Sequence, residues 1–300
     1  MKLPLPDGRR TPALKLERTA VSRQSTFWRD RLIELVSLQA LLRPHRPLPR
    51  EFTTLMRCRT EENVHHTVCE KCGVPHHFDY HCNKRFCPCC AWQLSCERRK
   101  ILEACAPLLR QPKHVVLTAR NQSSLKSMFK VVLAGVRKLR RREVFKQVRG
   151  GWCSFEVTNE GRGWHVHAHL LVDVRWLPAD VLAREWAACV GQDFAIVKVK
   201  DAREKKYLAE VTKYSVKPSV FIQWPHSNRI EFVQAIRGKR MFFAFGHVAE
   251  ASSAYRANLK VSRGIHRTNC CASQALTAVS VLCNPKNLHK VKPRVRSQLK

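Results

Sequence analysis

One short segment, from Trp164 to Val172, constrains the fold of this chain more than any other, because it contains three histidines at every second position from 165 to 169. Side chains alternate between the two faces of a β-strand, so His165, His167 and His169 are predicted to share one face. The apolar residues between them are predicted to face a hydrophobic core. Three imidazoles on one face can bind a metal ion, although a polar sheet face or a structural zinc site would give the same pattern.

A glutamate and a tyrosine four residues apart, Glu210 and Tyr214, follow farther along the chain. On a helix this spacing places both side chains on one face, which offers a carboxylate and a nucleophile together. Tyr207 lies seven residues before Tyr214 and is a second candidate tyrosine, while an ordinary solvated helix face is the competing interpretation. Together with the histidine strand, the pattern indicates cleavage of a phosphodiester bond by a tyrosine beside a metal ion.

Charge points to a polyanionic partner. The chain has 300 residues, with 55 Lys and Arg against 23 Asp and Glu, for a net charge of +32. Phosphate neutralisation with counterion release rewards such a composition, so we expect the protein to bind nucleic acid. No run reaches the roughly 18 consecutive apolar residues of a membrane span, and Met1–Asp7 lacks the apolar core of a signal peptide. We therefore expect a cytoplasmic protein with no membrane partner.

The chain has fourteen cysteines, and nine of them cluster in its first half. In a reducing compartment such a cluster is typical of metal ligands rather than disulfides. Two Cys-x-x-Cys pairs, Cys69 with Cys72 and Cys87 with Cys90, have the spacing of a structural zinc site, and Cys82 is an alternate ligand. Free buried thiols are the competing interpretation. We predict one Zn²⁺ that organises a small basic module.

Hydrophobic periodicity predicts an α+β protein, with helices on one face of an antiparallel sheet and a small zinc-binding module beside it. Strands are predicted over residues 114–118, 152–158, 164–172, 194–199 and 240–246. Helices are predicted over residues 25–42, 94–109, 124–148 (one helix or a pair), 179–190 and 202–217, the last terminated by Pro218.

Residues 159–163 include two glycines and are predicted to close a hairpin that ends in the histidine strand. With a four-residue loop, Glu156 would lie opposite His165 on the same face. A carboxylate among imidazoles favours Mg²⁺ or Mn²⁺ over the ions that prefer nitrogen ligands alone.

Taken in order, the motifs resemble those of the Rep_1 group of plasmid rolling-circle replication initiators, in the HUH endonuclease superfamily. The segments that carry the resemblance are Val115–Asn121, Phe155–Thr158, His167–Val172 and Glu210–Lys217. The segment Cys82–Cys90 resembles the cysteine motif of this group and is similar to the layout in IS91-type transposases. Val166 stands where many relatives carry proline, and the resemblance covers residues 69–246.

The resemblance implies an enzyme that nicks single-stranded DNA and transfers the strand through a 5′-phosphotyrosine on Tyr214. It implies that Glu210 activates a water at termination. Plasmid DNA, with its double-strand origin and single-stranded nick site, would be the partner, together with a host helicase and polymerase. An HUH transposase or relaxase is the first alternative, and a non-enzymatic zinc-containing DNA-binding protein is the second.

Four regions are expected on this basis. They are an N-terminal arm and helix (1–50), the cysteine module (51–105), an HUH endonuclease domain (106–250) and a basic C-terminal tail (251–300).

Overall fold

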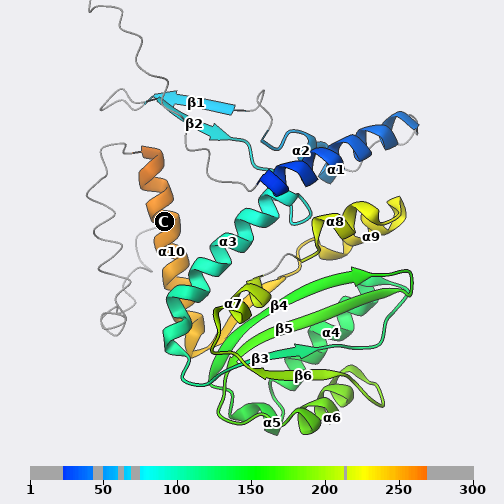
Figure 1. Cartoon of the computed structure of the whole chain (residues 1–300), viewed down its shortest axis with the longest axis vertical. Helices are drawn as coiled ribbons and strands as arrows, with labels where there is room; N and C mark the ends of the chain where they lie inside the picture. The colour runs from blue at the N-terminus through cyan, green and yellow to red at the C-terminus, as the bar shows by residue number, and fades with distance from the viewer. Residues whose placement is uncertain (1–22, 43–49, 60–63, 69–74, 213–214, 269–300) are drawn as a thin grey trace, which may run out of the picture.

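A five-stranded antiparallel sheet, with strand order β6-β3-β5-β4-β7, lies at the centre of the described structure (Figure 1). This computed structural model describes residues 23–42, 50–59, 64–68, 75–212 and 215–268. The strands of the sheet are β3 (Pro112–Leu117), β4 (Gly150–Asn159), β5 (Trp164–Asp173), β6 (Val197–Asp201) and β7 (Phe242–Gly246). The predicted α+β class and antiparallel sheet are confirmed.

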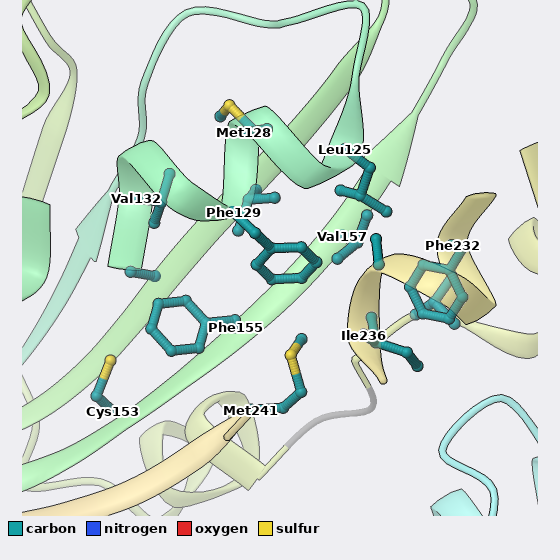
Figure 2. Close-up of a cluster of buried hydrophobic side chains, with 14 of the residues drawn as sticks. Leu125, Met128, Phe129, Val132, Cys153, Phe155, Val157, Phe232, Ile236 and Met241 are labelled. Atoms are coloured by element: carbon teal, nitrogen blue, oxygen red, sulfur yellow. The ribbon is translucent and has the colours of Figure 1, made fainter. Parts of the chain in front are cut away.

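Helices cover both faces of the sheet. The helices are α1 (Arg23–Leu42), α2 (Arg50–Met56), α3 (Pro88–Cys105), α4 (Leu125–Leu139), α5 (Glu143–Lys146), α6 (Ala179–Val190), α7 (Lys205–Thr212), α8 (Pro218–Gln223), α9 (His226–Ile236) and α10 (His247–Thr268), with a 3-10 turn over Ala106–Leu108. Apolar side chains of α4, α6 and α9 pack in the larger core, part of which Figure 2 shows. Those of α3, α7 and α10 form a smaller core on the opposite face.

The prediction that helices occupy one face only was wrong. In β5, Val166, Ala168 and Leu170 belong to the larger core, whereas Leu171 belongs to the smaller one with Trp152 of β4. The histidines occupy the half of β5 that precedes Leu171, so their polar face gives way to an apolar face along the same strand. The uninterrupted apolar run after His169 is the sequence signal for a strand that is buried on both faces.

The predicted helix 179–190 is confirmed to the residue as α6. The predicted segment 124–148 is a helix pair, α4 and α5, and the predicted strand 194–199 begins only at Val197. In place of one helix over 202–217, α7 ends at Thr212 and a new helix, α8, begins at Pro218. Proline suits the first position of a helix, where its missing N–H leaves no hydrogen bond unmade.

The cysteine module contains regular structure that the sequence pattern did not indicate. Strands β1 (Val64–Val68) and β2 (Pro75–Asp79) form an antiparallel pair, and α2 precedes them. At the other end of the chain, α10 runs across residue 250, where the sequence analysis placed a domain boundary, and its Val248 and Ala251 are buried in the smaller core.

Candidate active site and metal centre

The three histidines lie on one face of β5, as the alternation predicted. His165 and His167 are half-buried and His169 is 7% exposed, while Val166 and Ala168 between them are fully buried on the opposite face. The ring centroids of His165 and His167 are 4.2 Å apart, and those of His167 and His169 are 6.0 Å apart. The strand therefore presents a row of imidazoles beyond the edge of the smaller core.

Glu156 shares this face but pairs with a different histidine from the one predicted. The register joins Glu156 to His167 rather than His165, and the Glu156 Oε2 lies 3.2 Å from Nε2 of His169. The four-residue loop is residues 160–163, because Asn159 still pairs with Trp164. Gly163 closes it with φ +90°, packed so tightly against the Gln122 carbonyl that a Cβ would lie 2.8 Å from that oxygen.

His165 and His167 are held in their neutral form at neutral pH. Burial, together with charge repulsion from the neighbouring His165 and His169, lowers the pKa of His167 to about 4. Burial also lowers the pKa of His165 below its ordinary value. A neutral imidazole keeps a lone pair on one ring nitrogen, which is the form that binds a metal ion.

Asn121 orients the ring of His165. Its amide nitrogen donates to the Arg162 carbonyl at 3.1 Å, and its Oδ1 forms a short hydrogen bond with Nδ1 of His165. Because the amide oxygen can only accept, the proton of the neutral ring belongs on Nδ1. This tautomer leaves the lone pair on Nε2 of His165, and such a partner commonly fixes a metal-binding histidine.

The donor set suits a divalent cation. Nδ1 of His169 is buried and has no hydrogen-bond partner among the described residues. Neutral imidazoles beside one carboxylate match the mixed nitrogen and oxygen ligands that Mn²⁺ accepts. Within the described part of the chain, however, the donor atoms of these four residues do not all come within 4.8 Å of one another. Side-chain rotation is required before they can surround one ion.

Two short contacts hold the chain on either side of Tyr214, which itself lies outside the described residues together with Lys213. On the preceding side, the Ser95 hydroxyl of α3 donates to the Thr212 carbonyl at 2.6 Å. On the following side, the backbone N–H of Val157 donates to the Ser215 carbonyl at 2.8 Å. Val157 is the residue after Glu156 on β4, so the chain rejoins the sheet beside the candidate metal ligands.

Glu210 and Tyr207 both lie on α7, which packs on the histidine-bearing face. The Tyr207 ring lies 5.4 Å from the ring of His114, which in turn stacks on His169 at 5.7 Å. Tyr207 is therefore linked to the histidines through one intervening ring. Glu210 is half-buried. Lys206, which lies one helical turn before Glu210, forms an ion pair with Glu204 at 2.7 Å.

A groove of about 490 Å³ opens on the other side of Glu156, between β4 with its hairpin loop and the α8–α9 segment. Polar side chains line it, among them Thr158, Lys217, Gln223 and Asn228. Its size falls in the range of pockets that hold small ligands. Glu156 thus belongs to the histidine face and also lines the groove.

A second group of metal-binding side chains is buried in the cysteine module. The thiols of Cys58, Cys82, Cys87 and Cys90 lie within 4.8 Å of one another, and three of their Sγ–Sγ distances are 3.6, 3.7 and 3.7 Å. Disulfide sulfurs would be about 2.05 Å apart. Four sulfurs at about 2.3 Å from a tetrahedral Zn²⁺ would be separated by about 3.8 Å. The cluster can therefore hold a metal such as zinc.

The cluster includes Cys87, Cys90 and the alternate Cys82, as predicted, together with Cys58, which was not among the predicted ligands. The other predicted pair, Cys69 and Cys72, lies outside the described residues. The β1–β2 hairpin brings the residues after β2 back beside the residues before β1, where the Arg59 N–H donates to the Tyr80 carbonyl at 2.9 Å. Cys82 therefore lies near Cys58. No local spacing in the sequence reveals that return.

Local electrostatics favour a thiolate at Cys90 in this cluster, whereas hydrogen bonds to the other cysteines raise the pKa of Cys87. Cys87 is the N-cap of α3 and Cys90 lies in its first turn, where the helix dipole stabilises negative charge. Hydrogen bonds from the thiols of Cys58, Cys82 and Cys87 lower the pKa of Cys90 well below its ordinary value. The cluster therefore stabilises negative charge on Cys90.

The cysteine cluster and the helix that starts at it contact both flanks of the tyrosine segment. Helix α3 starts at the cluster and carries Ser95, which bonds Thr212. Phe86, between the cluster cysteines in sequence, stacks on Phe221 of α8 with ring centroids 5.8 Å apart. Order in the cysteine module is thereby transmitted to the chain on both sides of Tyr214.

These features define a basic α+β protein with a histidine-bearing sheet and a separate buried group of four thiols. Residues 77–266 match the Rep_1 family model, described as "Replication protein", which covers more than half of the chain. The chain belongs to this family, whose members are rolling-circle replication initiators. No curated protein and no solved structure matches it. In the described part of the chain, no helix has both the length and the apolarity needed to cross a membrane.

Proposed function

We propose that the protein initiates rolling-circle replication of a plasmid by nicking single-stranded DNA at the origin with Tyr214. The main support is the hydrogen bond from the Val157 N–H to the Ser215 carbonyl. Ser215 follows Tyr214 directly, so this bond holds the chain beside Tyr214 against β4, the strand that carries Glu156. Glu156 pairs with His167 across the hairpin. The family to which the chain belongs and its net charge of +32 agree with a DNA substrate.

In the proposed reaction the phenolic oxygen of Tyr214 attacks the scissile phosphorus and loses its proton. The bond from phosphorus to the 3′-oxygen breaks, and that oxygen takes a proton to become a 3′-hydroxyl. The 5′-phosphate remains attached to Tyr214 as a phosphodiester, which conserves the bond energy for later strand transfer. A polymerase can then extend the free 3′-hydroxyl.

His167, His169, His165 and Glu156 are the residues that would hold Mg²⁺ or Mn²⁺. When bound there, the ion would neutralise charge that develops on the phosphate oxygens. The residues of the chain orient the reacting groups around it. Asn121 sets the tautomer of His165, and the half-buried positions of His165 and His167 on β5 keep these two rings neutral.

Removal of either His167 or His169 should abolish metal-dependent nicking. We expect His167→Ala and His169→Ala each to lower the rate of plasmid nicking by at least about a hundredfold at saturating Mn²⁺, because each removes a ligand. Nicking of supercoiled plasmid over a Mn²⁺ titration measures this. His247→Ala is the control, since His247 lies 3.6 Å from Asp173 at the opposite end of β5. Full activity of either variant at low Mn²⁺ contradicts the metal site.

Glu210 is proposed to activate the water that ends replication. We expect Glu210→Ala to nick DNA and to become attached through Tyr214, because attack by the phenol does not require that water. Release should fail, so covalent adducts should accumulate in a plasmid termination assay. Tyr207→Phe keeps the ring beside His114 and serves as the comparison. If Tyr207→Phe shows the release defect and Glu210→Ala does not, a second tyrosine ends replication instead.

We also propose that Cys58, Cys82, Cys87 and Cys90 bind one structural Zn²⁺, since their spacing is that of a tetrahedral site. Four thiolates leave no open position for substrate. A zinc site that includes Cys69 and Cys72 is a separate proposal. The zinc content of variants at these two positions distinguishes it from the site formed by Cys58, Cys82, Cys87 and Cys90.

Two other functions predict different results. A non-enzymatic zinc-containing DNA-binding protein would bind supercoiled plasmid but would neither nick it nor become attached to it. A transposase or relaxase of the same chemistry would nick DNA but would not sustain replication of a small circle that carries this gene alone. Nicking with covalent attachment, followed by autonomous replication of that circle, distinguishes the three.

A further inference from the structure

Two large apolar side chains are exposed together at one end of the sheet. Phe194 is 65% exposed and Ile196 is 58% exposed. Both precede Val197, the first residue of β6, which is the edge strand of the sheet next to β3 (Figure 1). Adjacent exposed apolar groups of this size on a soluble surface commonly mark a binding site. Here a cationic side chain accompanies them. Arg120 lies over the ring of Phe194, at 5.9 Å from its centroid.

Ile196 of this pair lies on the histidine-bearing face. The Ile196 carbonyl accepts from the backbone N–H and the hydroxyl of Thr118, so the pairing of β6 with β3 extends to Ile196. Alternation along the strand then places Ile196 and Lys198 on one face. Lys198 lies opposite Val116 on β3, and Val116 lies opposite His169 on β5. Residues that lie opposite one another share a sheet face, so this face is the one that carries the histidines.

The surroundings of the pair are already ordered. The Trp186 indole donates to the Thr118 carbonyl at 2.6 Å, and the Arg120 N–H donates to the side chain of Gln192 at 3.1 Å. These bonds hold both segments that carry the exposed groups. Little conformational entropy would be lost when a ligand binds there.

We propose that Phe194, with Ile196 and Arg120, is a stacking platform for one base of single-stranded DNA on the β6 side of the histidine row. An aromatic face stacks on any base, and Arg120 and Lys198 can neutralise the adjoining phosphates. The single strand would run from this platform across the histidines to the groove beside Glu156. The platform rests on the proposed function, because a strand that is cut at the histidines must cross their face.

Binding of a fluorescent single-stranded oligonucleotide, measured by anisotropy without divalent cations, tests the platform. We expect Phe194→Ala to raise the dissociation constant about five- to twentyfold, because a stacking surface is lost. Phe194→Tyr should bind as the unmodified protein does. Trp176→Ala is the matched control, because Trp176 is 69% exposed but follows the opposite end of β5. Equal losses in the Phe194→Ala and Trp176→Ala variants, or no loss in either, overturn the platform.

An abasic substrate locates the contact. One abasic site is moved along the oligonucleotide, and binding is compared between the unmodified protein and Phe194→Ala. At the stacked position, loss of the base and loss of the ring should not be additive, since each removes the same contact. Additive losses at every position contradict the platform. Because no cleavage occurs in this assay, a failure of Tyr214 chemistry would appear only in nicking, and a failure of the platform would appear only here.

Discussion

Tyr214→Phe is expected to abolish nicking and covalent attachment while single-stranded DNA binding survives. The substitution removes only the nucleophilic oxygen, so we expect the nicking rate to fall by at least about a thousandfold. The measurement is conversion of supercoiled plasmid to nicked circles, with attached protein detected on labelled DNA after denaturation. DNA binding by the same variant should be unchanged in an anisotropy assay.

Tyr207→Phe is the matched control for this substitution, since it removes the same oxygen from the other tyrosine on this part of the chain. Tyr207 packs against the smaller core and the His114 ring, and phenylalanine preserves both contacts. We expect Tyr207→Phe to form the covalent adduct at the initial nick. If Tyr214→Phe still becomes attached to DNA and Tyr207→Phe does not, the nucleophile is Tyr207.

Cys58→Ser and Cys82→Ser are each expected to release zinc and to destabilise the cysteine module. Structural zinc contributes on the order of 10 kcal/mol to small domains, so we expect Tm for this region to fall by about 10 °C or more. Nicking should also fall, because α3 starts at the cluster and its Ser95 bonds the Thr212 carbonyl just before the tyrosine segment. Elemental analysis, thermal melting and plasmid nicking measure the three effects.

Two comparisons make the zinc experiment decisive. Cys96→Ser changes a half-buried cysteine of α3 outside the cluster and should keep the metal. The double variant Cys69→Ser, Cys72→Ser should also keep it if Cys58 and Cys82 complete the site. If the double variant loses its zinc and Cys58→Ser keeps it, the ligands are the two Cys-x-x-Cys pairs instead. Absence of zinc from the reduced unmodified protein would contradict a structural zinc site altogether.

The two groups of metal-binding side chains differ in chemistry as well as place. The cysteine cluster is fully enclosed, and four soft thiolates favour zinc over magnesium or manganese. The histidine row is half-buried and includes a carboxylate, which suits a divalent ion that must also contact a phosphate. Chelation that removes zinc should therefore act on stability, whereas withdrawal of Mn²⁺ should act on cleavage alone.

The sequence by itself determined the features that depend on neighbouring residues. The spacing of two between histidines placed His165, His167 and His169 on one face of β5, because strand geometry repeats every second residue. The same rule put Glu156 on that face of β4. The Cys-x-x-Cys spacing likewise brought Cys87 and Cys90 together at the start of α3, since one helical turn spans them.

Only the tertiary structure decided which distant residues complete each group. Glu156 pairs with His167 rather than His165 because the loop begins one residue later than predicted, and register follows the position of the loop. Cys58 joins Cys82 because the β1–β2 hairpin returns the chain to its starting point. Periodicity reports which face a residue occupies within its own element, whereas the closure of a loop depends on packing between elements far apart in the sequence.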